Sequence, residues 1–311
     1  MTKILNYGSL NIDYVYDVPH FVKAGETLSS LNRNIFAGGK GLNQSIALAR
    51  AGGLVSHFGA VGKADSEILT EALKQNQIDT SFLKYRDLCS GHTIIQVDSH
   101  GQNCILLFGG SNQSLTHEEM DATLENFEAG DYLVMQNETN DLEYMLKAAS
   151  KKGIKACLNV SPITEELLAL PLELCHLLIV NEIEAAALSN LSEDSDPYDL
   201  LHALASKYPQ SSFVLTLGSR GSIIKLQGEE AISCKSFKVK AVDTTAAGDT
   251  YLGYLIANLA NGADTKTAVR EATAAAALAV QVKGAAPSIP SRAQVVEFLN
   301  ANPQEIIVAK L

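Results

Sequence analysis

Short apolar runs alternate with amphipathic segments along most of the chain. Apolar runs of four or five residues favour buried strands, and apolar positions three or four residues apart favour helices. The strands expected are residues 4–7, 55–58, 132–135, 155–158, 177–180 and 213–217. The helices expected are residues 41–51, 67–75, 142–152, 182–188, 198–207, 251–260, 266–282 and 292–299. This alternation predicts an α/β fold, a three-layer α/β/α sandwich around a mainly parallel central sheet.

Two stretches depart from this alternation, and neither shows a helical pattern. In residues 12–35 an apolar run gives way to a polar one, and in residues 92–108 two apolar runs flank a polar turn that predicts a β-hairpin. We expect the two stretches to form one small β-sheet lid over a core of residues 1–11, 36–91 and 109–311. Two unrelated surface hairpins are the alternative.

The composition limits the partners and the location of the protein. The 311 residues are 46% hydrophobic with a formal net charge of -11, which argues against nucleic acid or a membrane as partner. Residues 1–5 lead directly into an expected strand, so we expect no signal peptide and a cytoplasmic protein. The five cysteines lack CxxC spacing, and we expect reduced thiols, with Cys104, Cys157 and Cys175 in the core.

Residues 242–250, Val-Asp-Thr-Thr-Ala-Ala-Gly-Asp-Thr, give the strongest indication of chemistry. Ala246, Ala247 and Gly248 let a ligand approach the backbone, and N–H groups at the start of the following helix suit an anion such as phosphate. A carboxylate such as Asp249 beside phosphate is repelled unless a cation compensates or the carboxylate has a task, and the natural task is to accept a proton from an attacking hydroxyl. The segment therefore points to phosphoryl transfer, with a plain Thr-capped helix as the alternative.

Two segments nearer the start of the chain suit a polyol. Asn11 and Asp13 follow a strand and would point the same way if extended, which gives either a hydroxyl-binding pair or an Asx turn. Residues 37–44, Ala-Gly-Gly-Lys-Gly-Leu-Asn-Gln, place Lys40 and Asn43 near a helix start beside three glycines. No Ser or Thr follows the lysine and G-x-G-x-x-G is absent, so a polyol fits better than a nucleotide.

Two later segments follow expected strands. Residues 181–184, Asn-Glu-Ile-Glu, either cap a helix or hold hydrated Mg²⁺ through a carboxylate, and capping is favoured from this segment alone. Residues 216–221, Thr-Leu-Gly-Ser-Arg-Gly, form a flexible turn where Gly218 would let a nucleotide lie against the backbone. An ordinary turn explains this second segment equally well.

Together and in this order, these segments resemble the ribokinase family of carbohydrate kinases over nearly the whole chain. The strongest matches are residues 38–44, Gly-Gly-Lys-Gly-x-Asn-Gln, and 243–250, Asp-Thr-x-Ala-Ala-Gly-Asp-Thr; residues 181–184, 216–221 and 283–288 are also similar. The resemblance implies a ribokinase-like core with a β-lid. It implies an ATP-dependent kinase that phosphorylates the primary hydroxyl of a small sugar, first of all D-ribose to ribose 5-phosphate. Fructose, another pentose or a nucleoside are the alternative substrates.

The resemblance also implies roles for individual residues and a homodimer formed through the lid. It implies Asp249 as general base, beside an anion hole of Ala246, Ala247 and Gly248. The sugar would be held by Asn11, Asp13, Gly39, Lys40, Asn43, Glu138 and Asp249. The residues implied for ATP are Asn181, Glu184, Thr216, Gly218, Gly221 and Thr273, with Glu184 also holding Mg²⁺ through water. A monovalent cation, usually K⁺, would be held by Asp243, Thr245, Ala279, Val282, Gly284 and Ser288.

The chain departs from the family pattern in one segment. Ala64 stands where an Asp is expected, Asp65 is displaced by one position, and Glu67 replaces a glycine. We expect these differences to affect local packing and not the chemistry. Asn137, which precedes Glu138 at a position that varies in the family, is expected to retune the sugar pocket.

Two other classes of function remain as alternatives. A nucleotide-dependent oxidoreductase on a Rossmann sheet needs G-x-G-x-x-G after a strand, and the Gly8 region lacks those glycines. A sugar-binding protein without catalysis would have lost its base, whereas Asp249, Glu184 and the small-residue loop are all present.

Overall fold

The computed structural model describes residues 2–303 and 307–309, and its largest unit is a nine-stranded sheet. The strand order is β15-β14-β13-β12-β11-β10-β9-β1-β4. The parallel part consists of β1 (Lys3–Tyr7), β4 (Leu54–Phe58), β9 (Tyr132–Gln136), β10 (Lys155–Asn159), β11 (Leu177–Asn181) and β12 (Ser212–Thr216). Antiparallel pairing extends it through β13 (Ser222–Lys225), β14 (Ala231–Cys234) and β15 (Ile307–Ala309).

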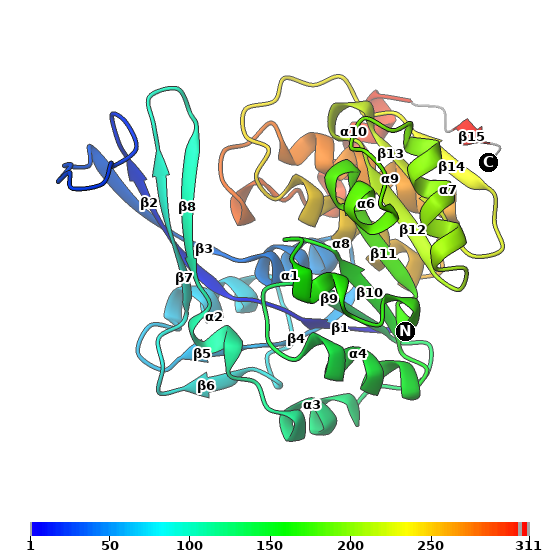
Figure 1. Cartoon of the computed structure of the whole chain (residues 1–311), viewed down its shortest axis with the longest axis horizontal. Helices are drawn as coiled ribbons and strands as arrows, with labels where there is room; N and C mark the ends of the chain where they lie inside the picture. Colours follow the sequence, from blue (N-terminus) through cyan, green and yellow to red (C-terminus); the bar gives the residue numbers. More distant parts are fainter. Residues whose placement is uncertain (1, 304–306, 310–311) are drawn as a thin grey trace.

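Alternate side chains of the central strands enter two different hydrophobic cores, one on each face of the sheet. In β1, Ile4 belongs to one core and Leu5 to the other, and both are fully buried. The first core also contains residues of α1 (Lys40–Arg50), α2 (Glu67–Gln75), α8 (Ala247–Ala260), α9 (Thr265–Ala279) and α10 (Arg292–Ala301). The second also contains residues of α3 (His117–Leu124), α4 (Leu142–Lys151), α5 (Glu165–Leu168), α6 (Glu182–Ser189) and α7 (Pro197–Lys207). This arrangement confirms the predicted three-layer α/β/α sandwich (Figure 1).

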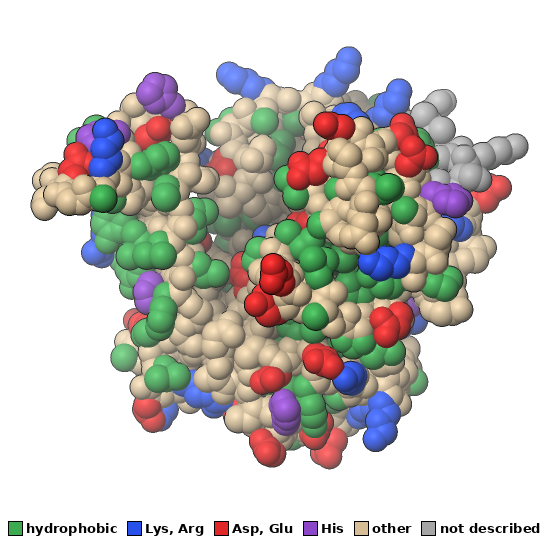
Figure 2. All heavy atoms as spheres, viewed as in Figure 1, with side chains coloured by type: hydrophobic (Ala, Val, Ile, Leu, Met, Phe, Trp, Pro, Cys, Tyr) green, Lys and Arg blue, Asp and Glu red, His purple; other side chains and the backbone are tan. Residues whose placement is uncertain are grey.

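A separate four-stranded sheet projects from one side of this core (Figure 1). We call it the lid sheet; its strands, in the order β3-β2-β7-β8, are β3 (Asn32–Gly38), β2 (Asn11–Asp17), β7 (Gly91–Val97) and β8 (Asn103–Phe108). A short pair, β5 (Ala60–Gly62) and β6 (Lys84–Arg86), lies below it. The molecular surface is hollowed between the lid sheet and the larger body (Figure 2).

The element bounds differ from the sequence predictions in a few places. The helix expected from residue 251 begins at Ala247, so Asp249 lies within its first turn. Strand β3 occupies a stretch whose polar pattern did not predict it, because most of its residues are exposed. Cys104 lies exposed on β8 and not in the core, whereas Cys157 and Cys175 are buried as expected. Both sides of β8 are exposed, so its apolar sequence does not mark a core strand.

No helix among the described residues has the length and apolar character needed to cross a membrane. The division of the chain into a core and a lid at residues 12–35 and 92–108 stays a prediction.

Candidate active site

A cavity of about 240 Å³ opens at the carboxyl ends of three parallel strands. Asn159, Asn181 and Thr216, the last residues of β10, β11 and β12, line one side of it. Open α/β sheets bind ligands at this edge. The rest of the lining includes Lys40, Ser161, Ile179, Val180, Glu184, Thr244, Ala246, Gly248 and Asp249. The cavity therefore brings together residues from both signature segments, which lie about 200 positions apart in the sequence.

The start of α8 presents unpaired backbone donors to this cavity. Ala246 precedes the helix in the left-handed conformation, with φ of 59°. Ala247 donates its N–H to the Thr244 carbonyl at 3.3 Å. Within the described part of the chain, the N–H groups of Gly248 and Asp249 have no hydrogen-bond partner. Such free donors at a helix start, together with the positive end of the helix dipole, favour an anion.

Asp249 faces the cavity although only 7% of its surface is exposed. Two amides of α1 hold its carboxylate: Asn43 donates from Nδ2 to Oδ2 at 3.2 Å, and Gln44 donates from Nε2 to Oδ1 at 2.8 Å. Helices α1 and α8 pack against each other, which brings these side chains together. A carboxylate fixed in this way can accept a proton from a hydroxyl bound in the cavity.

The lid sheet contributes a second carboxylate near the site. Asp13 lies on β2, where its Oδ1 accepts a hydrogen bond from Thr93 Oγ1 at 2.6 Å. A Cβ atom on Gly38 would lie 1.9 Å from Asp13 Oδ2, so only glycine leaves room for this carboxylate. Burial raises the pKa of Asp13 to about 6 against the hydrogen bond from Thr93, and the charge of Glu138 adds to the rise.

Asn11, Asp13, Gly39, Asn43 and Glu138, which are expected to hold the sugar, are not among the residues that line this cavity. Asn11 is buried, and its Oδ1 accepts from Asn112 Nδ2 at 2.8 Å. Glu138 follows β9, and its Oε2 accepts hydrogen bonds from Ser9 Oγ and from the Lys40 N–H. Gly39 has φ of 96°, and a Cβ there would lie 3.0 Å from the Ser9 carbonyl oxygen. The glycine-rich turn therefore packs directly against the loop after β1.

Lys40 is the cation at the centre of these carboxylates. Burial lowers its pKa, but the charges of Asp249, Glu138 and Glu184 outweigh burial and hold the pKa above its usual value. Burial in turn raises the pKa of Glu138, against the hydrogen bond from Ser9 and the charge of Lys40. The ammonium of Lys40 consequently stays charged where phosphate and a polyol would meet.

Asn181 and Glu184 form a reciprocal helix cap at the start of α6. Glu184 donates its N–H to Asn181 Oδ1 at 2.9 Å, and the Asn181 N–H donates back to Glu184 Oε2 at 2.9 Å. The capping role favoured from the sequence is therefore present, and both residues also line the cavity. Burial raises the pKa of Glu184 in spite of the Asn181 hydrogen bonds.

The residues that line the cavity suit a Mg²⁺ ion that is held mainly by phosphate and water. Among the described residues no group of three or more His, Cys, Asp or Glu side chains is arranged to bind a metal. Glu184 and Asp249 are the carboxylates that line the cavity, and so small a set matches the habit of Mg²⁺ to keep several waters beside substrate phosphates.

The residues expected around a monovalent cation lie partly together. Asp243 accepts hydrogen bonds from Thr245 N and Oγ1 at 2.9 and 2.6 Å, and from the Gly284 N–H at 2.9 Å. Burial raises the pKa of Asp243, but these hydrogen bonds and the charge of Lys283 hold it below its usual value. Asp243 therefore supplies a persistent negative charge next to the loop that precedes α8, which is the charge a cation needs.

The other three residues of that expected set are engaged in the neighbouring turn. The Val282 N–H donates to the Ala279 carbonyl at 3.0 Å. Ser288 Oγ donates to the Ala285 carbonyl at 2.8 Å. Hydrogen bonds from Val242 and Asp243 to the Val280 carbonyl tie this turn to the loop before α8.

The residues expected along the nucleotide are spread more widely. Thr216 lines the cavity, whereas Gly218 and Gly221 form the turn after β12 and do not line it. A Cβ on Gly218 would meet nothing within 4 Å, so this turn is open. Thr273 is buried in α9, where Oγ1 donates to the Val269 carbonyl at 2.8 Å. Their roles toward ATP stay predictions.

The structure also shows residues that the sequence did not single out. Asn159 and Ser161 line the cavity, but each is a common polar residue after a strand and no pattern distinguishes it. Asp65, displaced from the family position, accepts hydrogen bonds from the N–H and Oγ of Ser90. It thereby connects the loop before α2 to the residue that precedes the lid strand β7.

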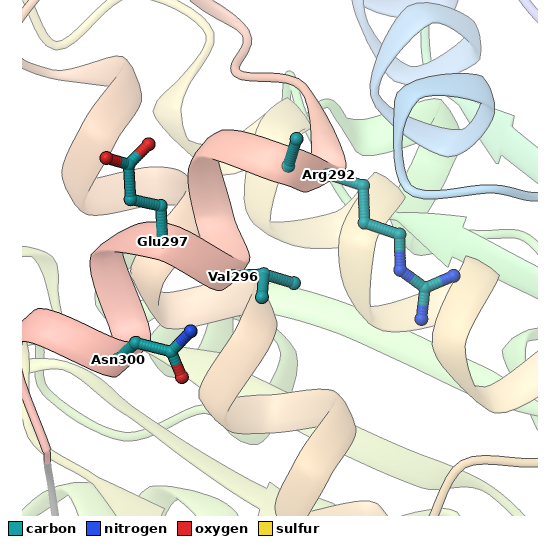
Figure 3. A pocket seen from close by; sticks show the side chains of 5 residues that line it. Arg292, Val296, Glu297 and Asn300 are labelled. Carbon is teal, nitrogen blue, oxygen red and sulfur yellow. The ribbon is translucent and has the colours of Figure 1, made fainter.

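A second hollow lies on the outer surface of α10 and has different chemistry (Figure 3). It has a volume of about 550 Å³ and is lined by Arg292, Ala293, Val296, Glu297 and Asn300. Its labelled side chains come from one helix, and none belongs to a signature segment (Figure 3). The cavity at the strand ends is therefore the candidate active site.

Comparison with known proteins establishes the family. Residues 1–292 match the pfkB family of carbohydrate kinases. The chain belongs to this family. It is 35% identical over 302 residues to the ribokinase of Haemophilus influenzae, covering 94% of this chain and 96% of that protein. It is 33% identical to the ribokinase of Schizosaccharomyces pombe, covering 95% of this chain and 97% of the relative.

A solved structure of the family has the same fold. The ribokinase of Arabidopsis thaliana, complexed with ribose and ATP, superposes with a TM-score of 0.84 at 29% identity. The match covers 96% of this chain and 98% of that one. The predicted family and the ribokinase-like fold are therefore confirmed.

Proposed function

We propose that this pfkB-family protein is an ATP-dependent ribokinase that converts D-ribose to ribose 5-phosphate. The observation that carries the proposal is the position of Asp249, whose carboxylate lines the same cavity as the unpaired N–H groups at the start of α8. Family relatives of similar length that are named ribokinase, two of them at 33% and 35% identity, support ribose as the substrate.

In this proposal Asp249 is the general base. It accepts the proton of the primary hydroxyl as that oxygen forms a bond to the γ-phosphorus of ATP and the bond from phosphorus to the ADP oxygen breaks. An anion hole was expected from Ala246, Ala247 and Gly248, but the Ala247 N–H is bonded to the Thr244 carbonyl. The N–H groups of Gly248 and Asp249 and the ammonium of Lys40 therefore stabilise the negative charge on the transferred phosphoryl group. Asn11, Asp13, Gly39, Asn43 and Glu138 hold the sugar hydroxyls.

Two ions and the remaining predicted residues complete the proposed site. Mg²⁺ would be held by ATP and by water next to Glu184, and would neutralise phosphate charge. A monovalent cation such as K⁺ would lie beside Asp243 and the turn of residues 279–288, and would stabilise the loop that precedes α8. We place the protein in the cytoplasm and propose a homodimer through the lid sheet.

A coupled assay of ADP release across a panel of sugars tests the function. We expect D-ribose to give a larger kcat/KM than 2-deoxyribose, fructose or a nucleoside. An Asp249→Asn variant should bind ribose but lose about 10²- to 10⁴-fold in kcat. If fructose turns over as well as ribose, the substrate assignment is wrong, and if Asp249→Asn keeps the parental kcat, the base assignment is wrong.

The ADP-release assay, together with measurements of ligand binding, separates the other classes of function. Ribose binding without ADP release would indicate a sugar-binding protein. Binding of NAD without binding of ATP, measured by calorimetry, would indicate an oxidoreductase.

A further inference from the structure

The Asp249 carboxylate is hydrogen-bonded to a buried chain of side-chain amides. Gln44 donates from Nε2 to Asp249 Oδ1 at 2.8 Å. Gln136 donates from Nε2 both to Gln44 Oε1 at 2.7 Å and to Asn6 Oδ1 at 2.8 Å. The three amide side chains belong to fully buried residues on α1, β9 and β1, and none of them lines the cavity.

At the end of this amide chain farthest from Asp249, the donor and acceptor of each hydrogen bond can be assigned in only one way. His57 Nε2 lies 3.2 Å from the Gly8 carbonyl oxygen, which only accepts, so Nε2 carries the proton and Nδ1 accepts from Ser45 Oγ at 2.8 Å. Burial lowers the pKa of His57 to about 4, so the ring is neutral near neutral pH. Asn6 Nδ2 donates to the Gly41 carbonyl and to Ser45 Oγ, each at 2.7 Å, so Asn6 Oδ1 must face Gln136.

At the end next to Asp249, the donors and acceptors can also be assigned in only one way. An ionised carboxylate only accepts, so Gln44 must present its NH₂ to Asp249 and its oxygen to Gln136. Gln136 thus lies between two acceptor oxygens, and both of its N–H donors are used. Its own Oε1 is buried and has no partner in the described part of the chain. An unpaired buried carbonyl costs about 1–3 kcal/mol, so this glutamine does not serve stability alone.

We propose that Gln44 and Gln136 are positioning residues that fix the orientation of the Asp249 carboxylate for proton abstraction. The proposal rests on the proposed function, in which Asp249 is the base. Without Gln44, the carboxylate would keep only the Asn43 contact at 3.2 Å, which is made from the side of the proposed sugar site. Neutral amides orient the acid without adding a charge beside Lys40. A misplaced reactive group costs up to about 10²-fold in rate.

Methionine substitutions test this role because methionine has nearly the length of glutamine and no N–H donor. In Gln44→Met and Gln136→Met we expect kcat to fall about tenfold and the KM for ribose to change less than twofold. The small effect on KM follows because both residues are fully buried and their side-chain hydrogen bonds are made to Asp249, Gln44 and Asn6. Gln75→Met is the matched control, because Gln75 is an exposed glutamine on α2 that bonds only Glu71, and it should keep the parental kcat.

A double mutant tests whether Gln136 acts through Gln44. In the Gln44→Met background, Gln136→Met should lower kcat no further, because the link to Asp249 is already lost. If the two substitutions lower kcat independently, so that their effects multiply in the double variant, Gln136 does not act through Gln44 and the proposal is wrong. Should Gln136→Met fail to fold in a thermal melt, Gln136→Leu gives the same test, because leucine also lacks an N–H donor and adds no charge.

The outcomes distinguish this proposal from the one on which it rests. If Asp249→Asn loses activity but Gln44→Met keeps the parental kcat, the positioning role is wrong and the base remains. If Gln44→Met instead raises the KM for ribose by the same factor as it lowers kcat/KM, then Gln44 acts in binding and the positioning role is again wrong. If Asp249→Asn is fully active, the proposed base is wrong and the positioning role with it.

Discussion

At the scale of single residues, two aspartates of the proposed site, Asp249 and Asp13, have different surroundings. Asp249 accepts two amide hydrogen bonds, whereas Asp13 accepts one from Thr93 and is close enough to Glu138 for its charge to matter. Burial raises the pKa of Asp13 from its ordinary 3.8 to about 6. A raised folded-state pKa means that the folded chain binds this proton more tightly than the unfolded chain does. Ionisation of Asp13 therefore reduces stability as pH rises from about 4 to about 6.

We expect Asp13→Asn to make the protein more stable and less active. At about pH 7.5 the variant should gain up to about 2–3 kcal/mol in the free energy of unfolding, and at about pH 4 the gain should vanish. The kcat/KM of the parent protein for ribose should fall as pH drops through about 6, since a protonated Asp13 accepts fewer hydrogen bonds from a sugar. Thermal melts and initial rates across pH measure both. If Asp13→Asn keeps the parental pH profile of kcat/KM, Asp13 does not contact the sugar.

Two glycines of the signature segments are required for different reasons. A Cβ on Gly41 would lie 2.3 Å from Ser9 N, so packing alone excludes any side chain there. A Cβ on Gly248 would meet nothing within 4 Å, and Gly248 lies in the first turn of α8 without a positive φ. Folding therefore does not require glycine at position 248, and we infer that the ligand does.

Alanine at each position separates the two cases. Gly41→Ala should lower the free energy of unfolding by about 1–3 kcal/mol through overpacking. Gly248→Ala should leave it unchanged or raise it by up to about 1 kcal/mol, because alanine is the better helix former. The same variant should lose about tenfold in kcat/KM for ATP, since the added methyl group lies where phosphate approaches the free N–H groups. Parental kinetics in a stable Gly248→Ala protein would contradict an anion site at the start of α8.

At the scale of elements, the regular part of the fold was predictable and the irregular part was not. Strands buried on both faces, such as β10 and β11, are continuous apolar runs, and the predicted bounds agree within two residues. Strand β3 was missed because its exposed residues are mostly polar. Helix α3 was also missed, although Thr116 and Glu119 form a capping box that the sequence displays.

The candidate site was predictable where adjacent residues form a motif and not where distant residues meet. Asn11, Lys40, Asn43 and Asp249 belong to segments with a recognisable pattern. The contact from Gln44 to Asp249 joins residues 205 positions apart, and that from Gln136 to Gln44 joins residues 92 positions apart. No local pattern encodes such contacts, because the packing of α1 against α8 and β9 creates them.

The loop before α8 is predicted to depend on a bound monovalent cation. Asp243 connects this loop to the turn of residues 279–288 through Gly284 and sustains a negative charge next to it. We expect activity to rise with KCl at constant ionic strength and to respond less to NaCl. Asp243→Asn should lose most of that dependence. The initial rate of ADP release during a salt titration measures it, and equal activation by both salts would argue against a specific cation site.

At the scale of the whole molecule, the lid sheet leaves an apolar face uncovered. Tyr14 pairs across the sheet with Ile35 and Ile94, and Ile94 pairs with Leu106, so these four side chains share one face. Asp13 and Thr93 lie on the opposite face, on which we expect the sugar to bind. Figure 2 shows hydrophobic side chains gathered over the lid. Apolar patches of this kind mark protein interfaces, and a second copy of this chain is the occupant that we propose.

A charge on this face tests the proposed dimer and its effect on the site. Leu106 is 67% exposed in the single chain, and we expect Leu106→Glu to prevent association, because a carboxylate would be buried without a partner. Leu168→Glu is the control, since Leu168 is 43% exposed and lies on α5, which is not part of the lid sheet. Sedimentation at micromolar concentration should give a dimer for the parent and the control and a monomer for Leu106→Glu. The monomer should also show a higher KM for ribose, because the lid sheet that carries Asn11 and Asp13 would lose its support. A monomeric parent protein would rule out the dimer, and a monomeric variant with the parental KM would show that association does not order the lid.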